Sequence, residues 1–444
     1  MLGYFLNLAI RSLRRNLVLT ALMVTAVGVG IGACMTVLTT LVAMSGNPIP
    51  DKSSQLYVPL IDVWGPGSRR ASAGPTADKL PDEFTYRDAT AFMKARVGAR
   101  QAAMYAVALN VSPPDAKPFE AQGRATFGDF FSMFDVPFRS GAPWGQREDD
   151  DRANVVVLTS KLADRVFPHS DAVGRTLSLS GHDYRVVGVI RPWTPTPRFY
   201  DAKDFGAYSD SEEFYLPFST AIDRQIQTTG SNWCHEAPPP GWEGHLNSSC
   251  VWLQFWVELP TPAQVRNFRT FLQGYAAEQQ RLGRFHWSSP TQLYDVMGWL
   301  AYQNVVPAEV RVNVLVAAGF LVVCLVNAVG LMLAKFAGCA KELALRRALG
   351  ASRGDVFQQC MAETLMVGLL GGGLGLILTA VGLAGLRALL AVTSSDSATG
   401  HLVTLNAGMV LITMGVAVVV TVSCGLYPTL RASRITPGWQ LKAP

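Results

Sequence analysis

The chain has 444 residues, 49% of them hydrophobic and only 16% charged, and its mean hydropathy of +0.21 is high for a soluble protein. Four segments without Asp, Glu, Lys or Arg each exceed the roughly 20 apolar residues that cross a bilayer. The composition therefore excludes a soluble protein, and we predict transmembrane helices at residues 16–46, 307–335, 361–387 and 402–430.

Basic residues set the expected orientation of these helices. Lys and Arg outnumber Asp and Glu in residues 1–15, 336–360 and 431–444, and the positive-inside rule places such segments in the cytoplasm. Residues 47–306 and the short loop 388–401 then lie on the periplasmic side of a bacterial inner membrane. The formal net charge of +5 follows from this topology, so membrane lipid is expected around the chain and no nucleic-acid partner.

The N-terminal segment is predicted to form an amphipathic helix. Residues 1–15 carry apolar side chains at helical spacing and arginines at their end, a pattern typical of a helix on the cytoplasmic membrane surface. The alternative is a helical start to the first span, which is too long for a signal peptide. Within that span Gly28 and Gly32 are four residues apart, so they permit close helix packing inside the chain or between two copies.

Residues 47–306 are long enough to form a domain with its own core. Runs rich in β-branched residues predict strands at 154–158, 176–179 and 184–190, with a hairpin turn at 181–183. Helical patterns occupy 84–97, 161–167 and 262–282. We therefore expect a large α+β domain between the first and second transmembrane helices.

Two cysteines lie in this region, Cys234 and Cys250, and an isolated pair in an oxidising compartment is most simply a disulfide. With His235 and His245 they also have the residue types of a zinc site, but adjacent Cys and His ligands suit one tetrahedral ion poorly. The nearby tryptophans are compatible either with core packing or with a binding surface. They are Trp233, Trp242, Trp252 and Trp256.

The third span is rich in glycine, including Gly368 and Gly372, which we interpret as tight helix packing. Glu363 at its cytoplasmic edge is expected to form an interfacial ion pair and not a proton relay. Pro428 is expected to kink or end the fourth helix.

A short charged helix is predicted between the second and third spans, within residues 341–355. Gly350 suits the C-cap of this helix, since glycine readily takes positive φ. Ser352 and Asp355 have the spacing of a capping box that starts the next helix. A compact basic helix at the entrance to a membrane span is well placed to be moved by a protein outside the membrane.

No catalytic, metal or cofactor site is predicted in this chain. The P-loop pattern G-x-x-x-x-G-K-[ST] is missing from the sequence, so the chain is not expected to bind nucleotide phosphates in that way. We therefore expect that it is not an enzyme.

The chain resembles the MacB/FtsX superfamily of ABC-transporter membrane subunits, the mechanotransmission type. The most specific stretch is KELALRRALGASR at residues 341–353, continued through AETL at 362–365 and the glycine-rich span. The others are YPTLRASRITP at 427–437 and, in the large domain, FFSMF at 130–134, NVVVL at 154–158, AVGR at 172–175 and YRVVGVI at 184–190.

This resemblance implies a pair of membrane subunits, identical or paralogous, driven by two copies of an ATPase subunit that binds ATP and Mg²⁺. Because the chain starts at the first membrane helix, the ATPase is expected to be a separate protein. The large domain is expected to have two subdomains and to meet a periplasmic adaptor and an outer-membrane channel. The residues expected to form the coupling helix and its cap are Lys341, Glu342, Ala344, Leu345, Arg346, Arg347, Ala348 and Gly350. Among them, Arg346 and Arg347 are expected to make charged contacts with the ATPase, and Ala344, Leu345 and Ala348 to pack against it.

The resemblance leaves three functions open. The first is efflux or secretion of a periplasmic substrate by movements of the periplasmic domain. The second is an FtsX-like role without transport, in which the domain regulates an envelope enzyme. The third is lipoprotein release from the outer leaflet of the membrane.

The cysteine pair gives a first testable prediction. A bridge between residues 234 and 250 should stabilise the large domain by roughly 3 kcal/mol on the chain-entropy model. Intact-mass analysis with thiol alkylation, without reduction, should find both cysteines unmodified. Alkylation of both Cys234 and Cys250 in the folded protein would contradict the pairing.

Overall fold

The computed structural model describes residues 8, 11–65, 79–113, 116–168, 170–204, 206–209, 212–393 and 407–433. The chain divides into two compact units. Residues 1–45 and 306–444 form the membrane domain, and residues 46–305 form the large domain. The large domain is thus inserted between the first and second long helices, as predicted.

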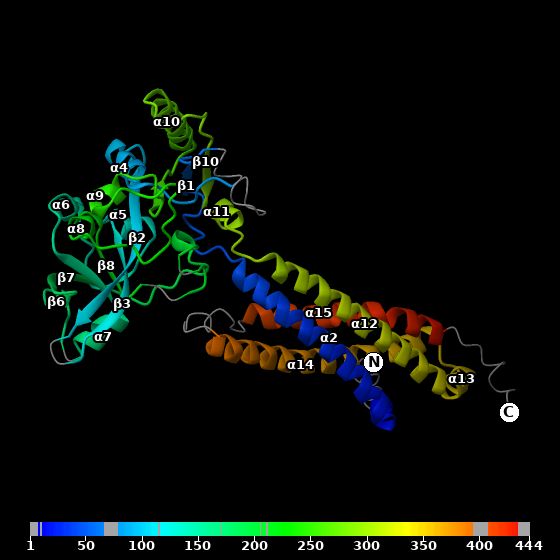
Figure 1. The fold of residues 1–444 in the computed structure, drawn as a ribbon. Coiled ribbons are helices and arrows are strands. Elements are labelled where there is room, and N and C mark those ends of the chain that lie inside the picture. The colour runs from blue at the N-terminus through cyan, green and yellow to red at the C-terminus, as the bar shows by residue number, and fades with distance from the viewer. Residues whose placement is uncertain are drawn as a thin grey trace. The chain divides into compact units, whose positions relative to one another are not determined.

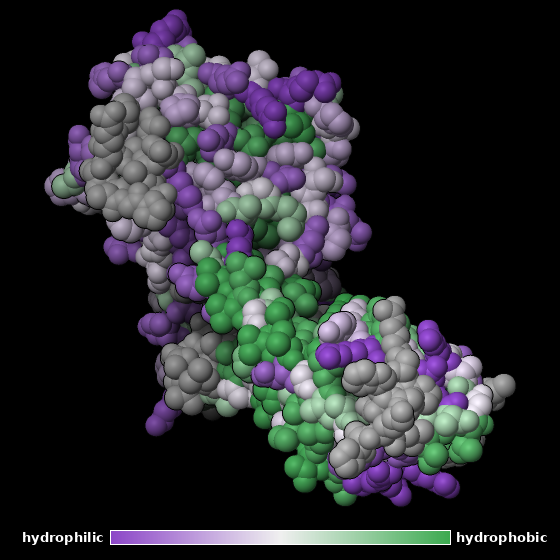
Figure 2. Space-filling view, turned by 90° about the vertical axis from the view of Figure 1, so that its right-hand side faces the viewer, coloured by the Kyte–Doolittle hydropathy of each residue, from purple (hydrophilic) through white to green (hydrophobic). Residues whose placement is uncertain are grey.

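The membrane domain contains four long helices (Figure 1): α2 (Leu17–Met44), α12 (Ala308–Gly338), α14 (Arg353–Thr393) and α15 (Ala407–Ser433). Each is long and apolar enough to cross a membrane. Their exposed surface is largely hydrophobic, whereas that of the large domain is mostly hydrophilic (Figure 2). The predicted class, four membrane helices with an inserted α+β domain, is confirmed.

Helix α2 packs closely on α14 through glycines. A Cβ atom added to Gly28 would stand 2.8 Å from the Leu374 side chain, and one added to Gly32 would stand 2.7 Å from the Cβ of Leu378. Side chains at these positions would push the two helices apart. The sequence alone left open whether Gly28 and Gly32 pack inside the chain or between two copies. The structure shows that they pack inside the chain.

Helix α14 also packs closely on α15, again through glycines of α14, on another of its faces. A Cβ on Gly368 would lie 2.6 Å from the Thr421 hydroxyl, and one on Gly372 would lie 2.8 Å from the Cβ of Ala417. Helix α15 continues through Pro428 to Ser433, so the proline does not end it. Because α2 and α15 each pack along both α12 and α14, the helices α12 and α14 occupy opposite corners of the bundle.

Several predicted boundaries fall at or beyond the described residues. Residues 11–15 are helical, whereas most of the predicted amphipathic helix, residues 1–7 and 9–10, lies outside the described part. So do most of the loop predicted at 388–401 and most of the tail predicted at 431–444. Helix α14 begins at Arg353, well inside the segment predicted as cytoplasmic.

The large domain is built on a ten-stranded mixed sheet in the order β10-β1-β9-β2-β3-β8-β5-β7-β4, with β6 against β2 and β7. Its strands are β1 (Leu56–Ile61), β2 (Arg100–Ser112), β3 (Phe119–Thr126), β4 (Phe138–Gly141), β5 (Val155–Thr159), β6 (Thr176–Leu179), β7 (His182–Ile190), β8 (Phe214–Pro217), β9 (Gln254–Glu258) and β10 (Thr291–Asp295).

The long strand β2 joins two parts of this sheet. Its first half pairs with β9, from Arg100 to Met104, and its second half pairs with β3, from Tyr105 to Val111. The domain nevertheless forms one compact unit. Its division into two subdomains stays a prediction.

Helices cover both faces of the sheet. They are α4 (Tyr86–Ala95), α5 (Asp129–Met133), α6 (Gln146–Asp150), α7 (Ser160–Val166), α8 (Phe218–Asp223), α9 (Gly241–Leu246), α10 (Pro262–Arg281), α11 (Val296–Tyr302) and the 3-10 helix η1 (Phe199–Asp201). Successive side chains of β9 point to opposite faces of the sheet. Phe255 is therefore buried in one core and Trp256 in the other. Helices α4 and α10 pack on the first core, and α5 and α11 on the second.

Local sequence signals account for several of these elements. Thr261 and Gln264 form a capping box at the start of α10, with Pro262 in the first turn. The β6–β7 hairpin turns at Ser180 and Gly181, both with positive φ, as a two-residue type I′ turn requires. The turn thus lies one residue before the position predicted from the sequence.

A disulfide joins Cys234 to Cys250. Because both sulfurs are in this bond, neither is available as a zinc thiolate. Core packing, one of the two alternatives left open for the tryptophans, holds for two of them. Trp252 and Trp256 are buried in the core, whereas Trp233 is 60% exposed.

Candidate functional site

The predicted coupling segment forms a separate helix, α13 (Ala340–Ala348), between α12 and α14. Gly350 ends it with φ of 105°, in the region that favours glycine. The Asp355 amide donates to Ser352 Oγ at 3.1 Å, and the Ser352 amide donates to Asp355 Oδ2 at 2.9 Å. The predicted glycine cap and capping box are confirmed, so a sharp turn separates α13 from α14.

One face of α13 is buried within the membrane domain. Ala340, Leu343 and Ala344 are 4%, 4% and 0% exposed, and their i, i+3, i+4 spacing puts them on one stripe of the helix. Ala344 was expected to pack against a partner. That expectation is wrong for this conformation, since the residue lies on the inward stripe.

The opposite face of α13 is open and partly apolar. Leu345 is 52% exposed and Leu349 is 80% exposed, and Lys341 and Ala348 are also exposed. Leu349 was not among the predicted contact residues. The signal that could have identified it is its position four residues after Leu345, on the same side of the helix.

A chain of polar contacts holds α13 against its neighbours. Glu342 accepts hydrogen bonds from Arg15 at 2.8 Å and from Arg346 at 2.9 Å, and Arg346 also donates to Gln359 Oε1 at 3.1 Å. These contacts tie the N-terminal residues, α13 and α14 together. Arg346, predicted to contact a partner, is thus engaged inside the chain, and Arg347 beside it is half-buried.

A buried ion pair joins α12 to α14 close to the ends that connect to α13. Lys335 Nζ in the last turn of α12 is 2.7 Å from Glu363 Oε2 in α14, with side chains only 2% and 6% exposed. Since α12 and α14 are at opposite corners of the bundle, the pair crosses its interior. The prediction of an ion pair at Glu363 is confirmed, and both of its side chains are buried within the protein.

Residues 350–354 spell Gly-Ala-Ser-Arg-Gly, which matches the G-x-S-x-G pattern of hydrolase nucleophile elbows. The surroundings do not fit that role. An elbow joins a strand to a helix, whereas this segment joins α13 to α14. Ser352 Oγ donates to Asp355 Oδ2 at 2.7 Å, so the hydroxyl serves as a helix cap.

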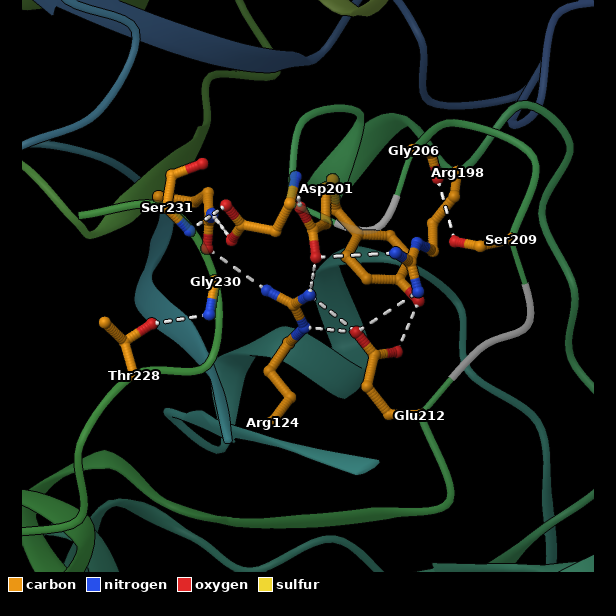
Figure 3. Close-up of polar contacts among 12 residues, drawn as sticks. Arg124, Arg198, Asp201, Gly206, Ser209, Glu212, Thr228, Gly230 and Ser231 are labelled. Carbon is orange, nitrogen blue, oxygen red and sulfur yellow. Dashed lines mark hydrogen bonds and ion pairs between the residues drawn. The ribbon is translucent and has the colours of Figure 1, made fainter. Parts of the chain in front are cut away.

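The large domain contains a second buried polar site, centred on Arg124 of β3 (Figure 3). The Arg124 Nε donates to Glu212 at 2.6 Å, its Nη1 donates to Gln254 Oε1 at 3.2 Å, and its Nη2 pairs with Asp201. A second arginine, Arg198, approaches both carboxylates. We call Arg124, Arg198, Asp201 and Glu212 the buried ion cluster.

Opposite charges balance within this cluster and shift its pKa values. Although burial opposes its charge, the guanidinium groups of Arg124 and Arg198 hold the pKa of Glu212 at about 2. Tyr200 also donates to Glu212, at 2.8 Å. Burial raises the pKa of Asp201, against the pull of Arg124.

The buried ion cluster gathers residues from distant parts of the chain. Arg124 lies in β3, Asp201 ends η1, Glu212 precedes β8 and Gln254 lies in β9. It therefore joins both parts of the sheet to the long β7–β8 connection. This arrangement stiffens the domain, and the mutual neutralisation of its two arginines and two carboxylates does not suggest a catalytic site. This cluster was not predicted from the sequence, and its one local signal is an arginine between the small residues Gly123 and Ala125 of β3.

The pair in the membrane domain can be tested by a double-mutant cycle. Lys335→Met or Glu363→Leu alone should lower the free energy of unfolding by about 3–5 kcal/mol, because each leaves one buried charge unpaired. The double variant Lys335→Met/Glu363→Leu should recover most of this loss. Thermal unfolding in detergent measures it, with the exposed-pair variant Glu342→Gln as a control expected to cost under about 1 kcal/mol. A double variant as unstable as the single ones would contradict the pairing.

The buried ion cluster gives a parallel prediction. Arg124→Met should destabilise the large domain by about 3–5 kcal/mol, because two buried carboxylates would keep only Arg198. The matched control is Arg139→Met, which breaks an exposed pair with Asp164 and should cost under about 1 kcal/mol. Denaturant unfolding followed by tryptophan fluorescence compares them, and equal midpoints would rule out a structural role for the cluster.

Comparison with known proteins agrees with this architecture. The family model described as the MacB-like periplasmic core domain matches residues 20–271, and the one described as the FtsX-like permease C-terminal matches residues 314–437. The macrolide export ATP-binding/permease protein MacB of Escherichia coli (strain K12) is 24% identical over 384 residues, covering 84% of this chain and 52% of that protein. MacB 2 of Aeromonas hydrophila subsp. hydrophila is 23% identical over 309 residues, covering 70% and 41%.

The chain thus spans about half the length of the curated relatives it matches. Two solved structures are also similar. The periplasmic region of MacB from Actinobacillus actinomycetemcomitans gives a TM-score of 0.36 at 14% identity, covering 56% of this chain and 92% of that one. The extracellular domain of the ABC-type transporter YknZ from Gram-positive bacteria gives 0.34 at 10% identity, covering 53% and 99%.

The first family model covers more than half of the 444 residues, and the second begins within α12 and extends past the end of α15. Together with the four membrane helices and the inserted domain, this agrees with the resemblance seen at residues 341–353. The chain is a multi-pass membrane protein with a periplasmic domain, and it belongs to the MacB/FtsX family of ABC transporter permeases.

Proposed function

We propose that this permease couples ATP hydrolysis by a separate ATPase subunit to movements of its periplasmic domain, which drive efflux or secretion of a periplasmic substrate. The observation that carries the proposal is α13. It is a short helix with a buried inner face, a partly apolar outer face and a defined cap at its end. An ATPase that binds the outer face can move the helix as one body.

The route from α13 to the periplasmic domain is short in sequence. Lys335 and Glu363 link α12 to α14 just beyond α13, and the close glycine contacts link α14 to α2. Helix α2 ends at Met44 and α12 begins at Ala308, so each is joined to the large domain by only a few residues. Displacement of α13 would thus reach both connections to the periplasmic domain.

The polar content of the membrane helices supports mechanical transmission more than a path for substrate. A path through the membrane usually requires polar or ionisable groups facing it. The buried charges Lys335 and Glu363 instead neutralise each other. In our proposal the substrate is therefore taken up and released by the large domain, outside the bilayer.

The proposed assembly contains two permease chains, identical or paralogous, and two ATPase subunits that bind ATP and Mg²⁺. The 444 residues contain no P-loop pattern, which supports an ATP site outside them. We place the complex in the bacterial inner membrane with both termini in the cytoplasm, in agreement with the basic residues near the helix ends. A periplasmic adaptor and an outer-membrane channel would complete an export route.

The FtsX-like match over residues 314–437 favours a second candidate function, regulation of an envelope enzyme without transport. Lipoprotein release from the outer leaflet is a third function that the same architecture would serve. A substrate-accumulation assay in cells that lack the chain separates export from regulation. An exporter mutant retains substrate, whereas a regulator mutant shows an envelope defect with unchanged retention.

The exposed face of α13 can be tested directly. Leu345→Asp/Leu349→Asp should abolish co-purification of the ATPase subunit in mild detergent, because the charges oppose burial of that face in an interface. Bound ATPase would be identified by mass spectrometry and by ATP hydrolysis. Membrane insertion should be unchanged.

The matched control is Leu282→Asp, which alters a leucine that is 65% exposed in the large domain. This control should retain the ATPase at the wild-type level. If the α13 variant also retains the ATPase with normal activity, α13 is not the docking site.

A further inference from the structure

The large domain has a groove that none of the functions above uses. Its volume is about 1340 Å³, larger than the roughly 300–1,000 Å³ of a typical small-molecule pocket. Its walls come from α4, α6, α8 and α9, with the start of β2. Figure 1 shows these four helices on the same flank of the domain. All of its lining residues belong to the large domain.

The groove has an aromatic floor. Phe218 stacks on Tyr86 with ring centroids 6.3 Å apart and on Phe127 with centroids 5.1 Å apart. Phe218 is buried, whereas Tyr86, Phe127 and Trp242 are half-buried, so part of each remains accessible. The Trp242 indole donates to the Ile222 carbonyl at 3.1 Å, which fixes α9 to α8. The floor is therefore a rigid surface for an apolar or aromatic side chain.

The rim of the groove is charged, with both signs in similar number. Its exposed cationic residues are Lys94, Arg96, Arg100 and Arg152, and its exposed anionic residues are Asp129, Asp150, Asp223 and Glu243. Such a rim suits a ligand that itself carries separated charges of both signs. A neutral ligand would have to desolvate charges such as those of Lys94 and Glu243 without compensation.

One carboxyl group on the lining is already used by the protein. Asp149 is buried and accepts hydrogen bonds from the Gly128 amide at 2.9 Å and from Trp144 Nε1 at 2.8 Å. Burial raises its pKa to about 7. Its role is to hold α5 and α6 in place. On the rim, Arg152 already pairs with Asp223 and Arg100 pairs with Glu258. The rim charges left to meet a ligand therefore include Lys94, Arg96, Asp150 and Glu243.

We propose that this groove binds an extended segment of polypeptide. An aromatic or aliphatic side chain of the segment packs on Tyr86, Phe127 and Trp242, while charged side chains on either side of it pair with the rim. A polypeptide supplies an apolar anchor and charges of both signs along one chain, and its length suits the size of the groove. The proposal does not depend on the proposed export function, because such binding requires no ATP.

The test uses the full chain in lipid nanodiscs without any ATPase. A phage-displayed library of random 12-residue peptides is selected on the wild-type protein, against empty nanodiscs as background. Enriched peptides should share an aromatic or aliphatic anchor flanked by charges. Synthetic copies are then measured by fluorescence anisotropy on wild-type protein and on variants that fill the groove.

The groove-filling variants are Thr90→Trp and Asn247→Trp, both at lining positions with side chains at least partly exposed. Each should weaken peptide binding by about tenfold or more, because the new indole occupies space that the peptide needs. A loss of this size corresponds to removing at least one strong interface contact. The matched control is Asn267→Trp on the exposed side of α10, outside the groove, which should bind as wild type does. Thermal unfolding checks that all three remain folded.

Three results would overturn the proposal. One is a selection that enriches no peptide above the nanodisc background. Another is enriched peptides that bind both groove-filling variants as tightly as wild type. The third is binding of a neutral oligosaccharide panel that is lost in the same variants while no peptide binds, which would assign the groove to glycans.

Discussion

The buried pair of Lys335 and Glu363 is the contact on which the α13 end of the membrane domain depends. Charges taken out of water require a partner at close range, and here the partners come from helices at opposite corners of the bundle. The pair sets where the last turn of α12 lies relative to α14. Since α13 is joined to both helices by only a few residues, its position follows from that of the pair.

The remaining contacts of α13 refine this position without adding much stability. Glu342, Arg346 and Gln359 form a partly exposed chain of hydrogen bonds, and contacts of this kind contribute little free energy in water. The buried stripe of Ala340, Leu343 and Ala344 decides which face of α13 turns outward, and these hydrogen bonds are consistent with that orientation. The combination of a buried pair and an exposed polar chain gives a helix that is firmly held yet open to a partner on one side.

The large domain shows a comparable division between rigid support and open surface. Arg124 draws together strands and loops that are far apart in sequence, and its carboxylate partners are fully buried. On another part of the domain, the half-buried aromatic rings and the exposed charges line an accessible groove. A domain that transmits force needs the first property, and one that binds a ligand needs the second.

Local signals account for most of what could be predicted from the sequence. The four spans follow from uninterrupted apolar composition, and the end of α13 follows from Gly350, Ser352 and Asp355, which act on their immediate neighbours. The contacts that could not be predicted are long-range. The bond between Arg15 and Glu342 joins residues 327 positions apart, and the orientation of Ala344 depends on which stripe the bundle buries.

The buried ion cluster illustrates the same limit. Nothing near Arg124 in the sequence indicates that Asp201 and Glu212 will surround it, because that depends on the pairing of β3 with β8. Composition can identify a domain with a core, but only the sheet order shows which charges are enclosed. Long-range packing of this kind is also why the groove could not be predicted from the sequence: its lining comes from elements far apart in the chain.

The central claim is that ATP-driven movement at α13 reaches the periplasmic domain. Hydrogen–deuterium exchange on the complex with its ATPase subunit, compared with and without bound ATP, tests it most directly. We predict that ATP changes exchange in α13 and also within residues 46–305. A complex that hydrolyses ATP, yet shows changes confined to α13 and the adjoining ends of α12 and α14, would contradict it.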